Sequence, residues 1–139
     1  MKRHSGWLAA GLLVFAVLAC NMSKNGNSNG PISEGHVAKD NNGQPGDKTN
    51  TFSPSDRTVH CVVTLKEGKE GQRLKFTWFI VDAEGVKNEK LKDIEYTTEG
   101  KENFVHGHLT WSKDWPSGKY KCEVDVNDHL EKTIDYFVK

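Results

Sequence analysis

The sequence lacks the motifs of the common enzyme classes. It contains no His-Glu-x-x-His zinc motif, no glycine-rich phosphate loop after a strand, and no serine or cysteine in a recognisable nucleophile turn. The acidic residues Glu95, Glu99 and Glu102 are scattered through turn-rich sequence and do not form a pattern of paired acid and base. We therefore expect a protein that is not an enzyme and needs no cofactor.

The chain also has no net charge at pH 7. The 139 residues include 19 Lys and Arg side chains and 19 Asp and Glu side chains, and the two signs are mixed along the chain. Nucleic-acid-binding proteins carry a basic patch or stripe, which such a composition does not supply. We therefore expect no nucleic-acid partner.

Long apolar runs are scarce, and the clearest one stands at the start of the chain. Trp7 to Leu18 is an apolar stretch of about a dozen residues, too short to span a bilayer as a mature helix. Lys2 and Arg3 precede it, and Val17-Leu18-Ala19-Cys20 ends it. This order of basic, apolar and small residues is typical of a signal peptide.

The ending resembles the lipobox of bacterial lipoproteins, in which an aliphatic and a small residue precede a cysteine that is acylated and becomes the new N-terminus. The resemblance covers residues 1–20 and implies a signal peptide of residues 1–19 and lipidation of Cys20. Several acyl chains on one cysteine give the stable membrane anchoring that a single chain does not. Because Asn21 rather than Asp follows, the resemblance implies a cell-envelope protein at the outer membrane. The alternative is an ordinary signal peptide that happens to end in cysteine.

Residues 20–51 have few large apolar side chains and are rich in Asn, Gly, Ser, Lys and Asp. Such a segment buries too little surface to offset the entropy lost on ordering. We therefore predict a disordered tether over residues 20–51 and a single folded domain over residues 52–139.

The predicted domain contains short runs of aromatic and β-branched residues separated by turn signals, and no helical period lasts for three turns. We expect an all-β fold, an antiparallel sandwich of six or seven strands. The sequence predicts a turn at residues 82–85, and the charged residues 88–92 form either a loop or a weak edge strand. The expected strands are 58–66, 73–82, 94–98, 104–112, 120–126 and 130–138.

Alternation along these strands turns Cys61, Trp78 and Cys122 toward the core. This trio resembles the immunoglobulin fold, in which a disulfide connects the two sheets over a tryptophan. The resemblance implies an immunoglobulin-like sandwich with a Cys61–Cys122 disulfide and a tyrosine corner at Tyr120. Since lipidation occupies Cys20, an even number of cysteines also remains for pairing outside the cytoplasm.

One predicted surface is a protein contact. Phe79 and Val81 point outward on one strand, and Phe137 points outward on the last strand, flanked by Lys121 and Glu123. Aromatic residues rimmed by charge are typical of protein interfaces. We therefore predict a non-catalytic binding module, anchored to the membrane by lipid, whose partner is another envelope or extracellular protein.

Two alternatives remain open from the sequence. Inhibition of a secreted hydrolase, a protease or a lysozyme, would need a protruding loop, for which residues 82–92 and 127–129 are the candidates. Metal binding would use His106 and His108, which point to the same face of a strand and suit zinc or copper. The sequence identifies no third ligand, and a solvated outer face is the competing interpretation.

Overall fold

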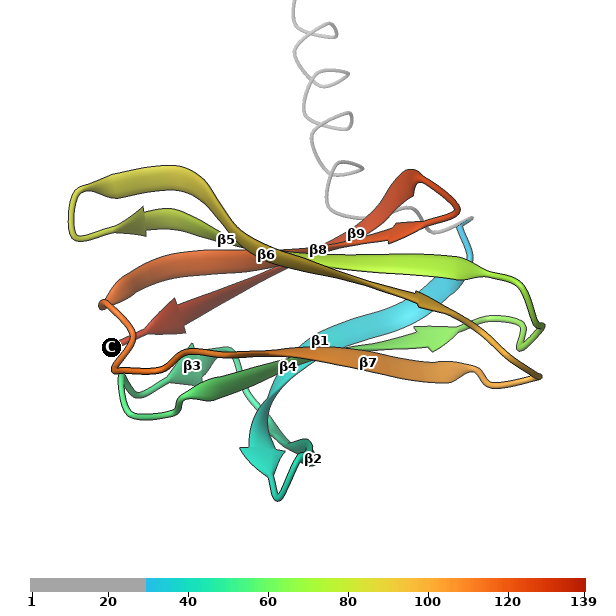
Figure 1. Ribbon diagram of the computed structural model, residues 1–139, viewed down its shortest axis with the longest axis horizontal. Helices are drawn as coiled ribbons and strands as arrows, with labels where there is room; N and C mark the ends of the chain where they lie inside the picture. The colour runs from blue at the N-terminus through green and yellow to red at the C-terminus, as the bar shows by residue number, and fades with distance from the viewer. Residues whose placement is uncertain (1–29) are drawn as a thin grey trace, which may run out of the picture.

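The computed structural model describes residues 30–139, and this part of the chain forms strands and turns without a helix (Figure 1). The predicted signal peptide and Cys20 lie outside the described residues. No helix in residues 30–139 is long and apolar enough to cross a membrane. The described strands are β1 (Ile32–Asn41), β2 (Gln44–Lys48), β3 (Thr51–Phe52), β4 (Thr58–Leu65), β5 (Arg73–Ala83), β6 (Val86–Thr97), β7 (Phe104–Thr110), β8 (Gly118–Val126) and β9 (His129–Val138).

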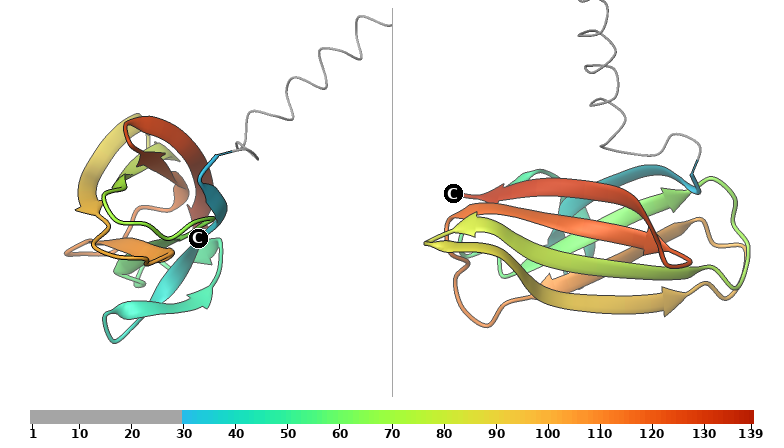
Figure 2. Two further views of the ribbon diagram at one scale, coloured as in Figure 1. Left: turned by 90° about the vertical axis from the view of Figure 1, so that its right-hand side faces the viewer. Right: turned by 90° about the horizontal axis from the view of Figure 1, so that it is seen from above.

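The strands form two sheets that pack face to face (Figure 1). One sheet has four strands in the order β2-β1-β4-β7, and the other has five in the order β3-β9-β8-β5-β6. Figure 2 shows the five-stranded sheet from above, with β9, β8, β5 and β6 side by side. The predicted all-β class is confirmed. The described part of the chain contains nine strands, more than the six or seven expected.

Two of the additional strands lie in the segment predicted to be a disordered tether, and that prediction is wrong for residues 32–48. β1 pairs with β4 from Ile32 to Lys39 and buries Val37 and Ala38. Asn42 and Gly43, with φ of 54° and 88°, turn the chain from β1 into β2. Asn-Gly is a strong hairpin signal because both residues tolerate positive φ. Pairing with β4 satisfies the backbone groups of a segment whose own apolar content is low.

The turn predicted at residues 82–85 is present, and residues 88–92, for which the sequence left a loop or a weak edge strand open, belong to an edge strand. Glu84 and Gly85 make a tight turn with φ of 49° and 85°, and β6 follows at once as the partner of β5. β6 is charged because it forms an edge of the five-stranded sheet, where most of its side chains are exposed. Charged side chains are a common way to protect such an edge.

The core lies between the sheets and contains the predicted trio. Cys61, Trp78 and Cys122 are fully buried, and Trp78 lies directly opposite Cys122 on the neighbouring strand. The Tyr120 hydroxyl donates a hydrogen bond to the Pro116 carbonyl at 2.5 Å. The two cysteines approach to 3.0 Å but are free, so no disulfide joins them here.

The two long sides of this sandwich differ. On one side β1 lies against β9, where Gly35 packs against Ile134, and β3 adds to β9, where the Phe137 N–H donates to the Asn50 carbonyl. The other side runs between the edge strands β6 and β7, and we call it the open side. The partly buried side chains that pack on the core all belong to β6 or directly follow β7: Val86, Leu91, Ile94, Tyr96 and Trp111. The core is therefore covered less completely on the open side.

Candidate functional site

β7 is the last strand of its sheet, so one of its edges has no neighbouring strand in the described part of the chain. The Asn103 carbonyl accepts from the Leu65 N–H, and the Trp111 N–H donates to the Arg57 carbonyl. The register between β4 and β7 continues without a bulge, so the odd-numbered residues of β7 bond to β4. The even-numbered residues therefore turn their backbone N–H and C=O groups away from β4: Phe104, His106, His108 and Thr110.

The edge strands differ in how well their sequences block a further strand. β6 carries six charged side chains: Lys87, Glu89, Lys90, Lys92, Asp93 and Glu95. β2 contains Pro45, Asp47 and Lys48, and β3 has only two residues. β7, with the sequence Phe-Val-His-Gly-His-Leu-Thr, has no Lys, Arg, Asp, Glu or Pro. Charge and proline are the usual protection of an edge strand, and β7 has neither.

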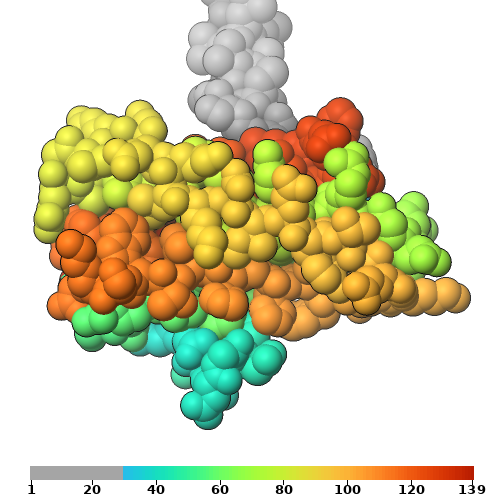
Figure 3. Space-filling view, viewed as in Figure 1, coloured from blue at the N-terminus to red at the C-terminus, as the bar shows by residue number. Residues whose placement is uncertain are grey.

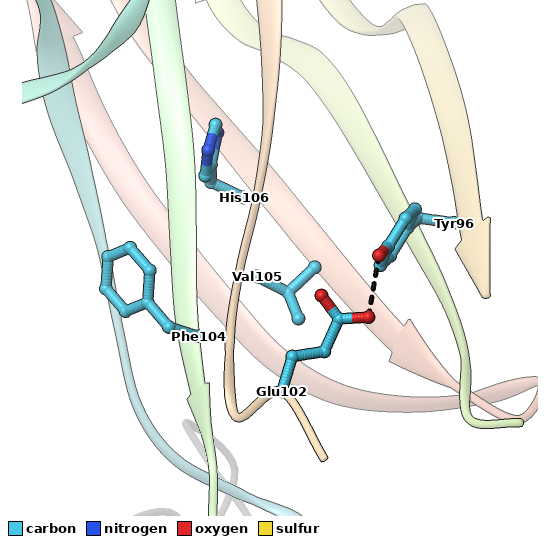
Figure 4. Close-up of a pocket in the computed structure, with 5 residues that line it drawn as sticks. All are labelled: Tyr96, Glu102, Phe104, Val105 and His106. Atoms are coloured by element: carbon cyan, nitrogen blue, oxygen red, sulfur yellow. Dashed lines mark hydrogen bonds between the residues drawn. The ribbon is translucent and has the colours of Figure 1, made fainter. Parts of the chain in front are cut away.

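A pocket of about 240 Å³ lies beside the start of β7 (Figure 4). In the close-up, Phe104 and His106 project to one side of β7, and Glu102 and Val105 to the other. The Tyr96 hydroxyl donates to the Glu102 carboxylate at 2.6 Å, and the Glu99 N–H donates to the same oxygen at 2.8 Å. The bond from Tyr96 lowers the pKa of Glu102 and raises the pKa of Tyr96 to about 12. Glu102 is therefore an anchored carboxylate at the end of the free edge.

Three histidines gather on the outer face of the four-stranded sheet. His60, fully buried, lies directly opposite His108, with ring centroids 5.3 Å apart, and its ring lies 5.7 Å from that of His106. Its Nε2 is 2.7 Å from the Asp40 carboxylate, and this hydrogen bond lowers the pKa of Asp40. Burial, followed by the proximity of His60 and His108, lowers the pKa of His106. The cluster therefore favours a neutral imidazole at His106.

The structure does not complete the predicted metal site. His106 and His108 share a face, as their spacing predicts, and His60 is the neighbour that sequence reasoning missed. Within residues 30–139, however, no three His, Cys, Asp or Glu side chains converge on a point that suits a metal ion. Because Cys61 faces the core, strand alternation predicts that His60 faces outward. The sequence does not predict the register between β4 and β7, which places His60 beside His108.

The predicted contact residues share the outer face of the five-stranded sheet but are only half-exposed. They are Phe79, Val81, Lys121, Glu123 and Phe137. Lys121 lies opposite Phe79, with its Nζ 5.0 Å from the ring centroid and 2.9 Å from the Glu123 carboxylate. Lys139 covers Phe137 in the same way at 5.9 Å. These lysines reduce the apolar area that this face offers to a partner.

The large hydrophobic side chains exposed in residues 30–139 lie elsewhere. They are Phe104, 54% exposed, and Leu130, 53% exposed. Leu130 stands beside the turn between β8 and β9, where Asn127 and Asp128 have positive φ. Phe104 is the first residue of β7 and lies on the free edge. The free edge and the thinly covered core thus coincide on the open side, and Phe104 stands at the end of that edge with its ring on the outer face of the four-stranded sheet.

The two candidate inhibitory loops are not extended loops. Residues 82–92 form the end of β5, a tight turn and the start of β6, and residues 127–129 form the turn between β8 and β9. Arg73 further restrains that turn through two hydrogen bonds to the Asp128 carboxylate, at 3.0 and 2.9 Å. The structure therefore gives the hydrolase-inhibitor hypothesis no specific support.

No family model matches this chain, and no curated protein is similar to it. The site must therefore be interpreted from its own geometry. An uncharged free strand edge with an exposed aromatic ring at its end offers main-chain hydrogen-bonding groups and apolar area, which are the features that strand addition uses.

Acidification should destabilise the domain through His106. Because its pKa is lowered in the folded protein, the unfolded chain takes up a proton at a higher pH than the folded protein does. The free energy of unfolding therefore falls as the pH decreases through about 6.5 and levels off below the folded pKa. We expect His106→Gln to flatten this dependence in urea unfolding, and His129→Gln, a change at an exposed position, to leave it unaltered. Equal pH dependence in wild type and His106→Gln would contradict the assignment.

Proposed function

We propose that this chain is a non-catalytic, lipid-anchored binding module of the bacterial cell envelope, which takes up an extended protein strand along β7. The observation that carries the proposal is that β7, alone among the described edge strands of useful length, lacks charge and proline. It also borders the side on which the core is least covered. In strand addition, main-chain hydrogen bonds supply affinity and side chains supply specificity.

An added strand would find complementary groups along the whole of β7. The free N–H and C=O groups of Phe104, His106, His108 and Thr110 would form a regular ladder. Each such hydrogen bond contributes about 1 kcal/mol, and covering an exposed Phe side chain adds about 1.5–3 kcal/mol. Tyr96 and Trp111, partly buried on the open side, would gain further cover.

The anchor and the finer details of the fold belong to the same proposal. Lipidation of Cys20 would place the module at the outer membrane, and residues 21–31 would separate the lipid from β1 by at most about 40 Å. The immunoglobulin-like classification with a Cys61–Cys122 disulfide is supported by the inward cysteines, the buried Trp78 and the Tyr120 corner.

Site-specific photo-crosslinking tests this function in cells that express the full chain. A photoreactive residue at Thr110, exposed on β7, should give covalent adducts with another polypeptide. The same residue at Thr133, on the outer face of β9, is the matched control and should give none. Adducts from Phe79 and Phe137 but not from Thr110 would overturn the β7 assignment in favour of the outer face of the five-stranded sheet.

A further inference from the structure

We propose that the strand bound along β7 is the β7 of a second copy of this chain, related to the first by a two-fold axis that passes midway between the two copies of Gly107. This inference rests on the proposed function and names its partner. The result would be a homodimer in which the two four-stranded sheets join into one continuous sheet.

The free edge of β7 is complementary to itself. Its outward-facing backbone groups belong to residues 104, 106, 108 and 110, which are spaced symmetrically about Gly107. Antiparallel pairing about that residue sets Phe104 opposite Thr110 of the second copy, and His106 opposite His108 of the second copy. All of these are hydrogen-bonded pairs, so each free N–H meets a free C=O. A shift by one residue would set outward-facing groups against inward-facing ones and lose the ladder.

Symmetry explains why the lack of charge matters. A two-fold axis brings each residue near the axis close to its own copy, so charged side chains on β7 would meet charges of the same sign, which is destabilising. The seven residues of β7 include no Lys, Arg, Asp or Glu. β6, the other long edge strand, places Lys90, Lys92 and Asp93 near its middle and is unsuited to such pairing.

The inner side of the interface also fits. Val105 and Leu109 face the core on either side of Gly107, and the second copy would extend this apolar layer across the axis. Gly107 itself is supported from within, since a Cβ there would lie 3.2 Å from the Phe76 ring and 3.4 Å from Trp78. β7 is therefore held firmly at the position of the axis.

The open side gives the second copy further surface to cover. Its partly buried side chains on β6 and after β7 include Ile94, Tyr96 and Trp111. Figure 3, viewed onto this side, shows β6 and β7 at the surface of the molecule. A two-fold axis between the two β7 strands turns the open sides of both copies toward each other. Membrane anchoring of both copies would raise their effective concentration and favour this pairing.

Cysteine crosslinking tests both the partner and the register. In membranes of cells that express two full-length variants together, Phe104→Cys in one copy and Thr110→Cys in the other should form a disulfide-linked dimer. A hydrogen-bonded pair has Cα atoms about 5.5 Å apart, which suits a disulfide. Each variant expressed alone is a matched control, because residue 104 and its own copy lie about 20 Å apart across the axis.

We expect at least about tenfold more dimer on a non-reducing gel from the mixture than from either variant alone, since only the mixture brings two cysteines within bonding distance. His108→Pro in both copies should abolish the excess, because proline removes a central donor of the ladder. The melting temperature of the His108→Pro variant is the control for folding. It should stay near the wild-type value, because the N–H of His108 faces away from β4. Equal dimer from the single variants and the mixture, or monomer throughout, would overturn the second-copy inference. If the photoreactive residue at Thr110 forms adducts with a different protein while the cysteine variants remain monomeric, the second-copy inference fails and the proposed binding function is retained.

Discussion

Replacement of Gly118 by alanine should lower the free energy of unfolding by about 3 kcal/mol or more, the range of severe overpacking. Gly118 begins β8 beside the end of β5, with φ of 155°. A Cβ at this position would lie 2.3 Å from the Asp82 carbonyl oxygen and 2.6 Å from the Ala83 Cβ. Neither atom is the end of a flexible side chain, so β5 and β8 would have to separate locally.

Urea unfolding of the purified protein measures this effect. Gly100→Ala is the matched control, because a Cβ at Gly100 meets no atom within 4 Å and the backbone there has no positive φ. We expect the control to unfold at nearly the wild-type urea concentration. Similar midpoints for the two alanine variants would show that the close approach of β5 and β8 is not required for stability.

Oxidation of Cys61 and Cys122 to a disulfide should produce the second large effect, an increase of about 4 kcal/mol in the free energy of unfolding. The bond would close a loop of about 60 residues, and the stabilisation follows from the entropy that this loop removes from the unfolded chain. Both cysteines are fully buried and 3.0 Å apart, so the bond needs little rearrangement of the core. Burial also raises the pKa of the Cys122 thiol, which suppresses the reactive thiolate in the folded protein.

Thermal melting with and without a reductant checks this expectation. The protein should be unfolded and refolded under each condition, because buried thiols exchange slowly in the folded state. We expect the oxidised protein to melt about 15 °C or more above the reduced protein. A Cys61→Ala, Cys122→Ala double variant should show no effect of the reductant. Equal melting temperatures of the oxidised and reduced wild type would argue against a structural disulfide.

The parts of the fold that the sequence predicts are those encoded by local alternation. The sequence predicts β4, β5, β7, β8 and β9 near their observed positions because alternate apolar residues of each strand face the core. The inward positions of Cys61, Trp78 and Cys122 follow from the same period. β1 and the part of β6 before the predicted strand at residues 94–98 depend on their partners instead. β1 is held by pairing with β4 and β6 by pairing with β5, and neither partner can be read from a local pattern.

The candidate site likewise has features that the local sequence predicts and features that it does not. The shared face of His106 and His108 is a local property of one strand, and it was predicted correctly. The position of His60 beside both of them depends on cross-strand register, which the sequence does not state. The same is true of the Lys121 side chain over the Phe79 ring. The free edge of β7 is a property of the whole topology, because a strand is an edge only when every other strand has been placed.

The strand order also has a consequence for the rate of folding. In the five-stranded sheet β5 pairs with β6, and β8 with β9, across tight turns, so these pairs form between neighbours in the chain. β4 must instead pair with β1 and β7, each separated from it by a long stretch of chain. Contacts between distant parts of a chain slow folding because a long loop must close first. Pairing of β4 with β7 and of β5 with β8, both between distant parts of the chain, should therefore be the slow steps, and the free edge of β7 becomes ordered only when β7 has paired with β4.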